Sequence, residues 1–162
     1  VLVDAGAGVT NIVVHEQAIP TFVRILVMGG DQITEALAAG MSISREEAEA
    51  AKRAAAVGQT QDVVGRIVTD QADAFVDEVR SSLDYYQAQT GSSGLSGVVL
   101  TGGASLLHGL SDRLAASVRL PVEVGNPFTR WPATDTVYSD EDLGRVGPSL
   151  VTAIGLALGG LE

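Results

Sequence analysis

The chain has 162 residues, of which 46% are hydrophobic, and 20 Asp and Glu residues outnumber 10 Lys and Arg residues, which gives a formal net charge of −10. This hydrophobic content excludes a disordered tail, and the absence of cysteine excludes a disulfide framework and a thiolate zinc site. The negative field argues against general nucleic-acid binding, although backbone N–H groups and magnesium can still hold one nucleotide.

Three short strands are predicted at the start of the chain. Residues 1–4 form a short apolar strand that ends in Asp4, residues 9–15 are rich in β-branched side chains, and residues 19–28 alternate between two faces. Short turns join them, so we expect an antiparallel meander. The chain opens on Val-Leu-Val, directly in a strand, and we therefore interpret it as part of a longer protein.

Two helices are predicted to follow the third strand. Asp31 is placed to cap the first helix, and Gly40 is placed to end it. Ser44 and Glu47 have the spacing of a capping box, which predicts the start of the second helix. Together these helices are expected to form a small lobe over residues 31–58.

The longest predicted element is an amphipathic helix. Apolar residues recur at steps of three and four from Val64 to Tyr86, and about 25 residues in a helix span ~37 Å. A strand at 97–100, a helix near 107–118 and a strand at 121–124 are expected next.

The last part of the chain is predicted to be largely irregular between residues 126 and 146. The acidic run 140–142 is expected in a solvated loop, and Pro148 in the first turn of a final helix.

This order of elements predicts an α/β fold with a mixed sheet and helices on its faces. We expect a core formed by residues 1–30 and 59–162, with the helical lobe of residues 31–58 inserted after the third strand.

The turn after the first strand carries a candidate anion site. Gly6, Ala7 and Gly8 form a tight turn whose backbone N–H groups can bind a phosphate without meeting a Cβ. Asp4 can hold Mg²⁺ through water, and Thr10 supplies a hydroxyl near the terminal phosphates. A plain β-hairpin with an acidic turn would have the same pattern.

A second candidate site follows the strand at 97–100. Gly102 and Gly103, with Ser105 beyond them, leave bare backbone at the end of a strand. A strand-to-helix turn that requires positive φ would also explain this pair.

A third candidate site lies on the second helix of the lobe. Glu49 precedes Lys52 by three residues and Arg53 by four, a spacing that by itself indicates ordinary helix pairing worth ~0.2–0.5 kcal/mol per pair.

Taken together, these three segments resemble the nucleotide motifs in the second half of actin-like ATPases, and more specifically the C-terminal half of the PilM family of type IV pilus assembly proteins. The resemblance runs nearly end to end. The stretches that carry it are GGDQITEA at 29–36, EEAEAAK at 46–52, RSSLDYY at 80–86, LTGGAS at 100–105, NPF at 126–128 and AIGLAL at 153–158.

The resemblance implies a ribonuclease-H-like unit that binds ATP and Mg²⁺. Glu49 and Lys52 would contact the ribose hydroxyls, and Arg53 would flank the base. Gly102 and Gly103 would lie against the adenosine, and Gly30 belongs to a Gly-Gly-acid turn that these families share. No catalytic residue is assigned, and we expect no ATP hydrolysis from this chain alone, because the first phosphate loop of the family is absent from it.

The resemblance also implies a cytoplasmic protein at the inner face of the plasma membrane, where it recruits a PilN-like inner-membrane protein, mainly through the other half of the molecule. Two different classes stay open: an FtsA-like cell-division protein or a half of a sugar-kinase-type phosphotransferase, and an interaction scaffold that holds no nucleotide.

Overall fold

The computed structural model describes residues 1–56, 62–91, 94–132 and 137–159, and its centre is a five-stranded mixed sheet of order β3-β2-β1-β4-β5. The antiparallel meander is confirmed: β1 (Leu2–Ala5) pairs with β2 (Thr10–Glu16), and β2 pairs with β3 (Ile19–Leu26). β4 (Val98–Thr101) runs parallel to β1, and β5 (Val122–Val124) runs parallel to β4. This topology is the mixed sheet that the order of elements predicts.

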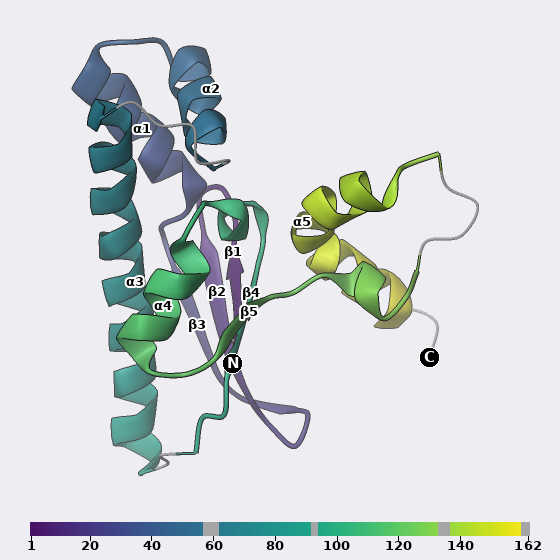
Figure 1. Ribbon diagram of the computed structural model, residues 1–162. Helices are drawn as coiled ribbons and strands as arrows, with labels where there is room; N and C mark the ends of the chain where they lie inside the picture. The colour runs from purple at the N-terminus through teal and green to yellow at the C-terminus, as the bar shows by residue number, and fades with distance from the viewer. Residues whose placement is uncertain (57–61, 92–93, 133–136, 160–162) are drawn as a thin grey trace.

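Helix α3 (Asp62–Thr90) is the longest element and lies along one side of the sheet beside α4 (Leu110–Val118), as Figure 1 shows. The predicted apolar stripe is confirmed, because its side chains are in the core. Tyr86 is buried against Phe22, with ring centroids 5.4 Å apart, and its hydroxyl donates a hydrogen bond of 2.6 Å to Glu16. This contact anchors the C-terminal part of the helix to β2 and β3.

Helices α1 (Gly30–Met41) and α2 (Arg45–Ala56) pack against each other and against the start of α3 (Figure 1). The capping box of α2 is confirmed: the Glu47 carboxylate accepts from the Ser44 backbone N–H at 2.9 Å, and the Ser44 hydroxyl accepts from the Glu47 N–H at 3.2 Å. The division of the chain into a core and an inserted lobe stays a prediction.

The predicted ends of α1 are wrong. The helix begins at Gly30 with Gly29 as its N-cap, so Asp31 lies inside the first turn and forms an ion pair of 2.9 Å with Arg45 instead. Gly40 lies within the helix, where an added Cβ would come within 2.8 Å of the Ile67 side chain. Close packing against α3 therefore explains Gly40, and Ser42 forms the left-handed C-cap.

The last part of the chain also differs from the prediction. A short 3₁₀ turn, η2 (Pro127–Thr129), is followed by α5 (Asp140–Gly159), so the acidic residues 140–142 form the first turn of a helix and not a loop. The Ser139 hydroxyl caps this turn by accepting from the Asp142 N–H at 3.1 Å.

Pro148 lies in the interior of α5 and not in its first turn. Its carbonyl accepts a hydrogen bond of 2.8 Å from the Gly102 N–H, which ties α5 to the end of β4. Figure 1 shows α5 on the side of the sheet opposite to α3. A proline in a helix interior removes one backbone bond, so a tertiary contact helps to hold the helix here.

Candidate functional site

A cavity of about 650 Å³ opens between the end of the sheet, the lobe helices and α5. It is lined by segments that are far apart in the sequence, and seven of its lining residues are ones that sequence analysis predicts. Those seven are Gly6, Ala7, Gly30, Glu49, Lys52, Arg53 and Gly103. The fold thus brings the three predicted segments together around one space.

The turn after β1 is held beneath the N-terminus of α1. The Gly6 N–H donates to the Val9 carbonyl at 3.0 Å, while the N–H groups of Gly30 and Asp31 donate to the carbonyls of Gly6 and Ala7 at 3.0 and 2.8 Å. The backbone N–H groups of Ala7 and Gly8 have no hydrogen-bond partner among the described residues. Two donors of this turn, rather than the whole turn, are therefore available to an anion.

Gly29 supports this turn, and sequence analysis did not assign it to the candidate site. A Cβ at Gly29 would overlap with the backbone carbonyls of Gly6 and Ala7. Only glycine lets the start of α1 approach so closely, and the close approach aligns the turn with the cavity. The Gly-Gly pair before the first lobe helix was the available signal.

Asp4, Gly8 and Thr10 do not line the cavity. Thr10 is fully buried, and its hydroxyl donates to the Met28 carbonyl at 2.9 Å, so it supports the turn from behind. The carboxylate of Asp4 accepts hydrogen bonds from the hydroxyls of Thr101 at 3.3 Å and Thr152 at 3.1 Å. These bonds orient Asp4 at the end of β1.

A single carboxylate with unused lone pairs fits Mg²⁺, which usually keeps several waters and takes one or two protein carboxylates. Within the described ranges, no group of three or more His, Cys, Asp or Glu side chains is placed to hold a metal ion. Asp4 is thus suited to contact a hydrated ion, not to enclose a bare one.

Helix α2 supplies the charged wall of the cavity, formed by Glu49, Lys52 and Arg53. The Lys52 ammonium lies 2.7 Å from a Glu49 carboxylate oxygen and donates to the Gly30 carbonyl at 3.1 Å. Arg53 Nε lies 3.2 Å from the other Glu49 oxygen. Lys52 is the only lysine of the chain, and its side chain is 17% exposed.

Thr34 is a second residue that sequence analysis missed. It is fully buried on α1, where its hydroxyl accepts from Lys52 at 2.8 Å and donates to Glu49 at 2.8 Å. The hydroxyl therefore joins the acid and the base of the charged wall and fixes both side chains.

The pKa of Glu49 reflects this network. Partial burial by itself raises the pKa, but the hydrogen bonds from Lys52 and Thr34 and the charge of Lys52 outweigh it and lower the pKa from 4.5 to about 2. Glu49 is therefore an anion at neutral pH, and its oxygens act as hydrogen-bond acceptors.

A second wall of the cavity is formed by residues 102–107, which follow β4, and we call it the glycine wall. Gly103, Ala104, Leu106 and Leu107 line the cavity directly. Gly102 lies behind them with φ +85°, a conformation open to glycine and strained for other residues. The buried hydroxyl of Ser105 donates to the Gly102 carbonyl at 2.7 Å, so both residues shape this wall without lining it.

The remaining lining residues are Ile33 of α1 and Arg145 of α5. The Arg145 guanidinium lies 2.8 Å from the Asp142 carboxylate, near the N-terminus of α5. Sequence analysis missed Arg145 because it placed residues 126–146 in an irregular segment. No short motif marks it, and only the position of α5 brings it to the cavity.

Among the residues that the structure describes, no helix combines the length and the apolar composition required to cross a membrane.

Comparison with known proteins identifies the family. The model of the type IV pilus assembly protein PilM family matches residues 1–161. A chain in a PilM–PilN type IV pilus biogenesis complex superposes with a TM-score of 0.83 and 29% identity, over 99% of this chain and 45% of that chain. The cell division protein FtsA of Pseudomonas aeruginosa is 29% identical over 182 residues, covering 99% of this chain and 42% of FtsA.

A Bacillus thuringiensis ParM hybrid protein solved with ADP superposes over 97% of this chain and 24% of that chain, with a TM-score of 0.55 and 17% identity, which shows the fold alone. The chain thus has an actin-like ATPase fold. It spans less than half the length of each of these relatives. On the match over residues 1–161, this chain belongs to the PilM family of type IV pilus assembly proteins.

Proposed function

We propose that this chain is the ATP-binding half of a PilM-like protein that works as a nucleotide-dependent scaffold in type IV pilus assembly. The observation that carries the proposal is that the charged wall and the glycine wall, with the turn after β1, border one cavity of about 650 Å³. That volume lies within the range of ~300–1,000 Å³ typical of small-molecule sites. The three segments offer the groups that a nucleotide needs.

Each wall suits a different part of ATP. The anionic Glu49 accepts hydrogen bonds from the ribose hydroxyls, and Lys52 holds it in place. Arg53 flanks the base, and Gly103 allows the adenosine to lie against backbone. The free N–H group of Ala7, which lines the cavity, binds a phosphate oxygen, and the N–H of Gly8 is available to a phosphate that extends beyond the lining. Asp4 would hold Mg²⁺ through water, and the ion would neutralise part of the phosphate charge.

The role in pilus assembly is the second part of the proposal. ATP closes the two halves of the longer protein around the cleft, and closure changes the affinity for a PilN-like inner-membrane protein at the cytoplasmic face of the membrane. The family match and the similarity to a chain of a PilM–PilN complex support this partner. We expect no hydrolysis from this chain alone, since the other half supplies the remaining phosphate contacts.

The test is protection of Lys52 by nucleotide in the full-length protein. An amine-acylating reagent is applied with and without Mg·ATP, and mass spectrometry measures the acylated fraction of the peptide that holds Lys52. We expect Mg·ATP to reduce this fraction severalfold, with half protection at a micromolar concentration. Equal acylation at millimolar ATP would contradict the nucleotide site and would favour the nucleotide-free scaffold.

The similarity to FtsA over 99% of the chain favours a cell-division role as the second candidate. Deletion of the gene distinguishes the pilus role from the cell-division role. Loss of surface pili with normal division supports the pilus role, whereas long undivided cells support the FtsA-like role.

A further inference from the structure

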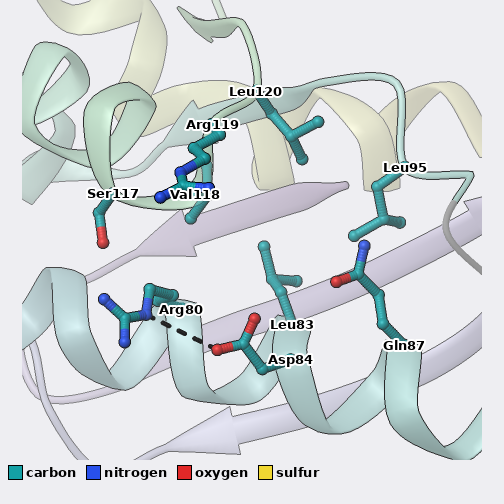
Figure 2. Close-up of a pocket in the computed structure, with 9 residues that line it drawn as sticks. All are labelled: Arg80, Leu83, Asp84, Gln87, Leu95, Ser117, Val118, Arg119 and Leu120. Atoms are coloured by element: carbon teal, nitrogen blue, oxygen red, sulfur yellow. Dashed lines mark ion pairs between the residues drawn. The ribbon is translucent and has the colours of Figure 1, made fainter.

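A second cavity, of about 290 Å³, lies between the C-terminal half of α3 and the segment that follows α4 (Figure 2). It shares no lining residue with the larger cavity. Arg80, Leu83, Asp84 and Gln87 recur at helical spacing along α3, so one face of the helix forms its floor. The nucleotide proposal does not use this pocket.

One end of the pocket is cationic. Arg80 Nε lies 3.6 Å from the Asp84 carboxylate, with both side chains more than half exposed, and this long contact leaves the terminal nitrogens of Arg80 available. The guanidinium of Arg119 has no hydrogen bond or ion pair to any residue in the described part of the chain. Two guanidinium groups against one carboxylate make this end positive, in a chain whose net charge is −10.

The backbone places Arg119 at this end. It is the C-cap of α4 and has left-handed geometry, with φ 57° and ψ 36°. This conformation turns the chain sharply into the segment before β5, so that Val118 and Leu120 also line the pocket.

The other end of the pocket is apolar. Figure 2 shows Leu83 pointing up from α3, with Leu95 and Leu120 on the far side of the space. Leu83 is buried in the core, and Leu95, Val118 and Leu120 are half-buried against it. A small aliphatic group placed here would lie beside these side chains and lose part of its contact with water.

We propose that this pocket binds the C-terminal residue of a partner chain, with an aliphatic side chain at the apolar end and the α-carboxylate on Arg119 and Arg80. The pocket lies just below the size of typical small-molecule sites, and it has room for about one residue. A chain terminus carries a carboxylate and a side chain on the same carbon, so one residue fills both ends. Guanidinium groups bind carboxylates through paired hydrogen bonds.

The test uses N-acetyl-L-leucine as the probe and ¹H–¹⁵N NMR spectra of the full chain. We expect saturable shifts of the Arg80, Asp84 and Arg119 amides with a millimolar Kd, and a Kd at least tenfold higher for N-acetyl-L-leucinamide, which has the same shape without the charge. Arg119→Gln should weaken the acid about fivefold and leave the weak binding of the amide unchanged. Arg66→Gln, which removes an exposed arginine elsewhere on α3, should change neither.

Three results would overturn the proposal. Equal binding of acid and amide would remove the role of the arginines. An absence of shifts at 50 mM N-acetyl-L-leucine would remove the site. Tighter binding of free leucine would show a pocket for an amino acid, because its ammonium group does not exist at the end of a peptide chain. None of these results depends on ATP.

Discussion

The two walls of the large cavity are built by different forces. The charged wall of α2 is held by ion pairs and by the buried hydroxyl of Thr34, which joins Lys52 to Glu49. The glycine wall at residues 102–107 is held by close backbone approach, with the Gly102 N–H on the Pro148 carbonyl at 2.8 Å. One wall depends on charge and the other on the absence of side-chain volume.

This difference predicts how each wall fails. A side chain added at Gly102, behind the glycine wall, has no space to occupy, so it should damage the fold itself. A charge removed from the other wall leaves the backbone in place, so it should mainly affect ligand binding and the response to pH. The following changes separate the two, from the largest expected effect to the smallest.

Gly102→Ala should have the largest effect. The new Cβ would overlap with the Ala5 carbonyl, would lie 2.8 Å from an Asp4 carboxylate oxygen, and would force alanine to φ +85°. Strain of this kind costs ~1–3 kcal/mol, and the overlap adds to it, so we expect a loss of more than about 3 kcal/mol in the free energy of unfolding, measured by urea denaturation.

Gly109→Ala is the matched control for that change. Gly109 has a similar φ of +74°, but an added Cβ would meet nothing within 4 Å. We expect a loss of about 1 kcal/mol from backbone strain alone. Similar losses for the two variants would show that strain, and not the close approach to β1, explains the glycine wall.

Lys52→Met should come next. Methionine keeps the apolar stem and removes the ammonium that bonds to Gly30, Thr34 and Glu49. We expect Mg·ATP affinity to fall about tenfold, ~1.4 kcal/mol, by isothermal titration calorimetry of the full-length protein. The stability should fall by about 1–2 kcal/mol, because Glu49 loses a charged hydrogen-bond partner.

Arg66→Met removes a cation that, unlike Lys52, is exposed, and it should leave both quantities unchanged. If Lys52→Met bound ATP as tightly as the wild type, the charged wall would have only a structural role.

Glu49→Gln should change the pH dependence of stability. Because folding lowers the pKa of Glu49 from 4.5 to about 2, its stabilisation is complete above pH 4.5 and is lost as the pH falls towards 2. The wild type should therefore exceed the variant by up to about 1 kcal/mol at pH 7, a modest value because a third of the side chain is exposed to solvent. Thermal unfolding followed from pH 7 to pH 2 measures how the difference in stability between the wild type and Glu49→Gln decreases.

Glu46→Gln supplies the control, since Glu46 is an exposed residue of the same helix and has no ion pair in the described residues. A gap between wild type and Glu49→Gln that stayed constant down to pH 2 would contradict the role of the Lys52 and Thr34 bonds.

Arg53→Gln should have the smallest effect. The side chain is 79% exposed, and its pair with Glu49 is of a kind that contributes less than ~0.5 kcal/mol. We expect unchanged stability and a two- to threefold loss of ATP affinity in the same calorimetric titration. A loss as large as that of Lys52→Met would mean that both cations act as one unit.

Local patterns predicted the elements that local forces decide. The capping box of Ser44 and Glu47 and the apolar face of α3 were correct, because side-chain period and nearby hydrogen bonds determine both. The predicted end of α1 was wrong, because Gly40 resembles a helix terminator in sequence, whereas the helix continues to Met41 and Gly40 packs close to the Ile67 side chain of α3.

The same limit applies to α5. Proline is favoured in the first turn of a helix, so the sequence pattern began the final helix at Pro148 and left residues 126–146 largely irregular, whereas α5 begins at Asp140. The helix is held by contacts from distant residues, including Gly102, and it places Arg145 at the cavity.

The sequence by itself determined the mixed sheet, the family and most of the candidate site, because the turn after β1, the α2 triplet and Gly103 each lie in a short motif. Only the tertiary structure decided which of these residues line the cavity and which support it from behind. Thr10 and Ser105 direct their hydroxyls to backbone carbonyls, and Thr34 completes the charged wall. The physical reason is that a motif specifies a local backbone shape, whereas lining a cavity depends on how elements that are distant in sequence pack together.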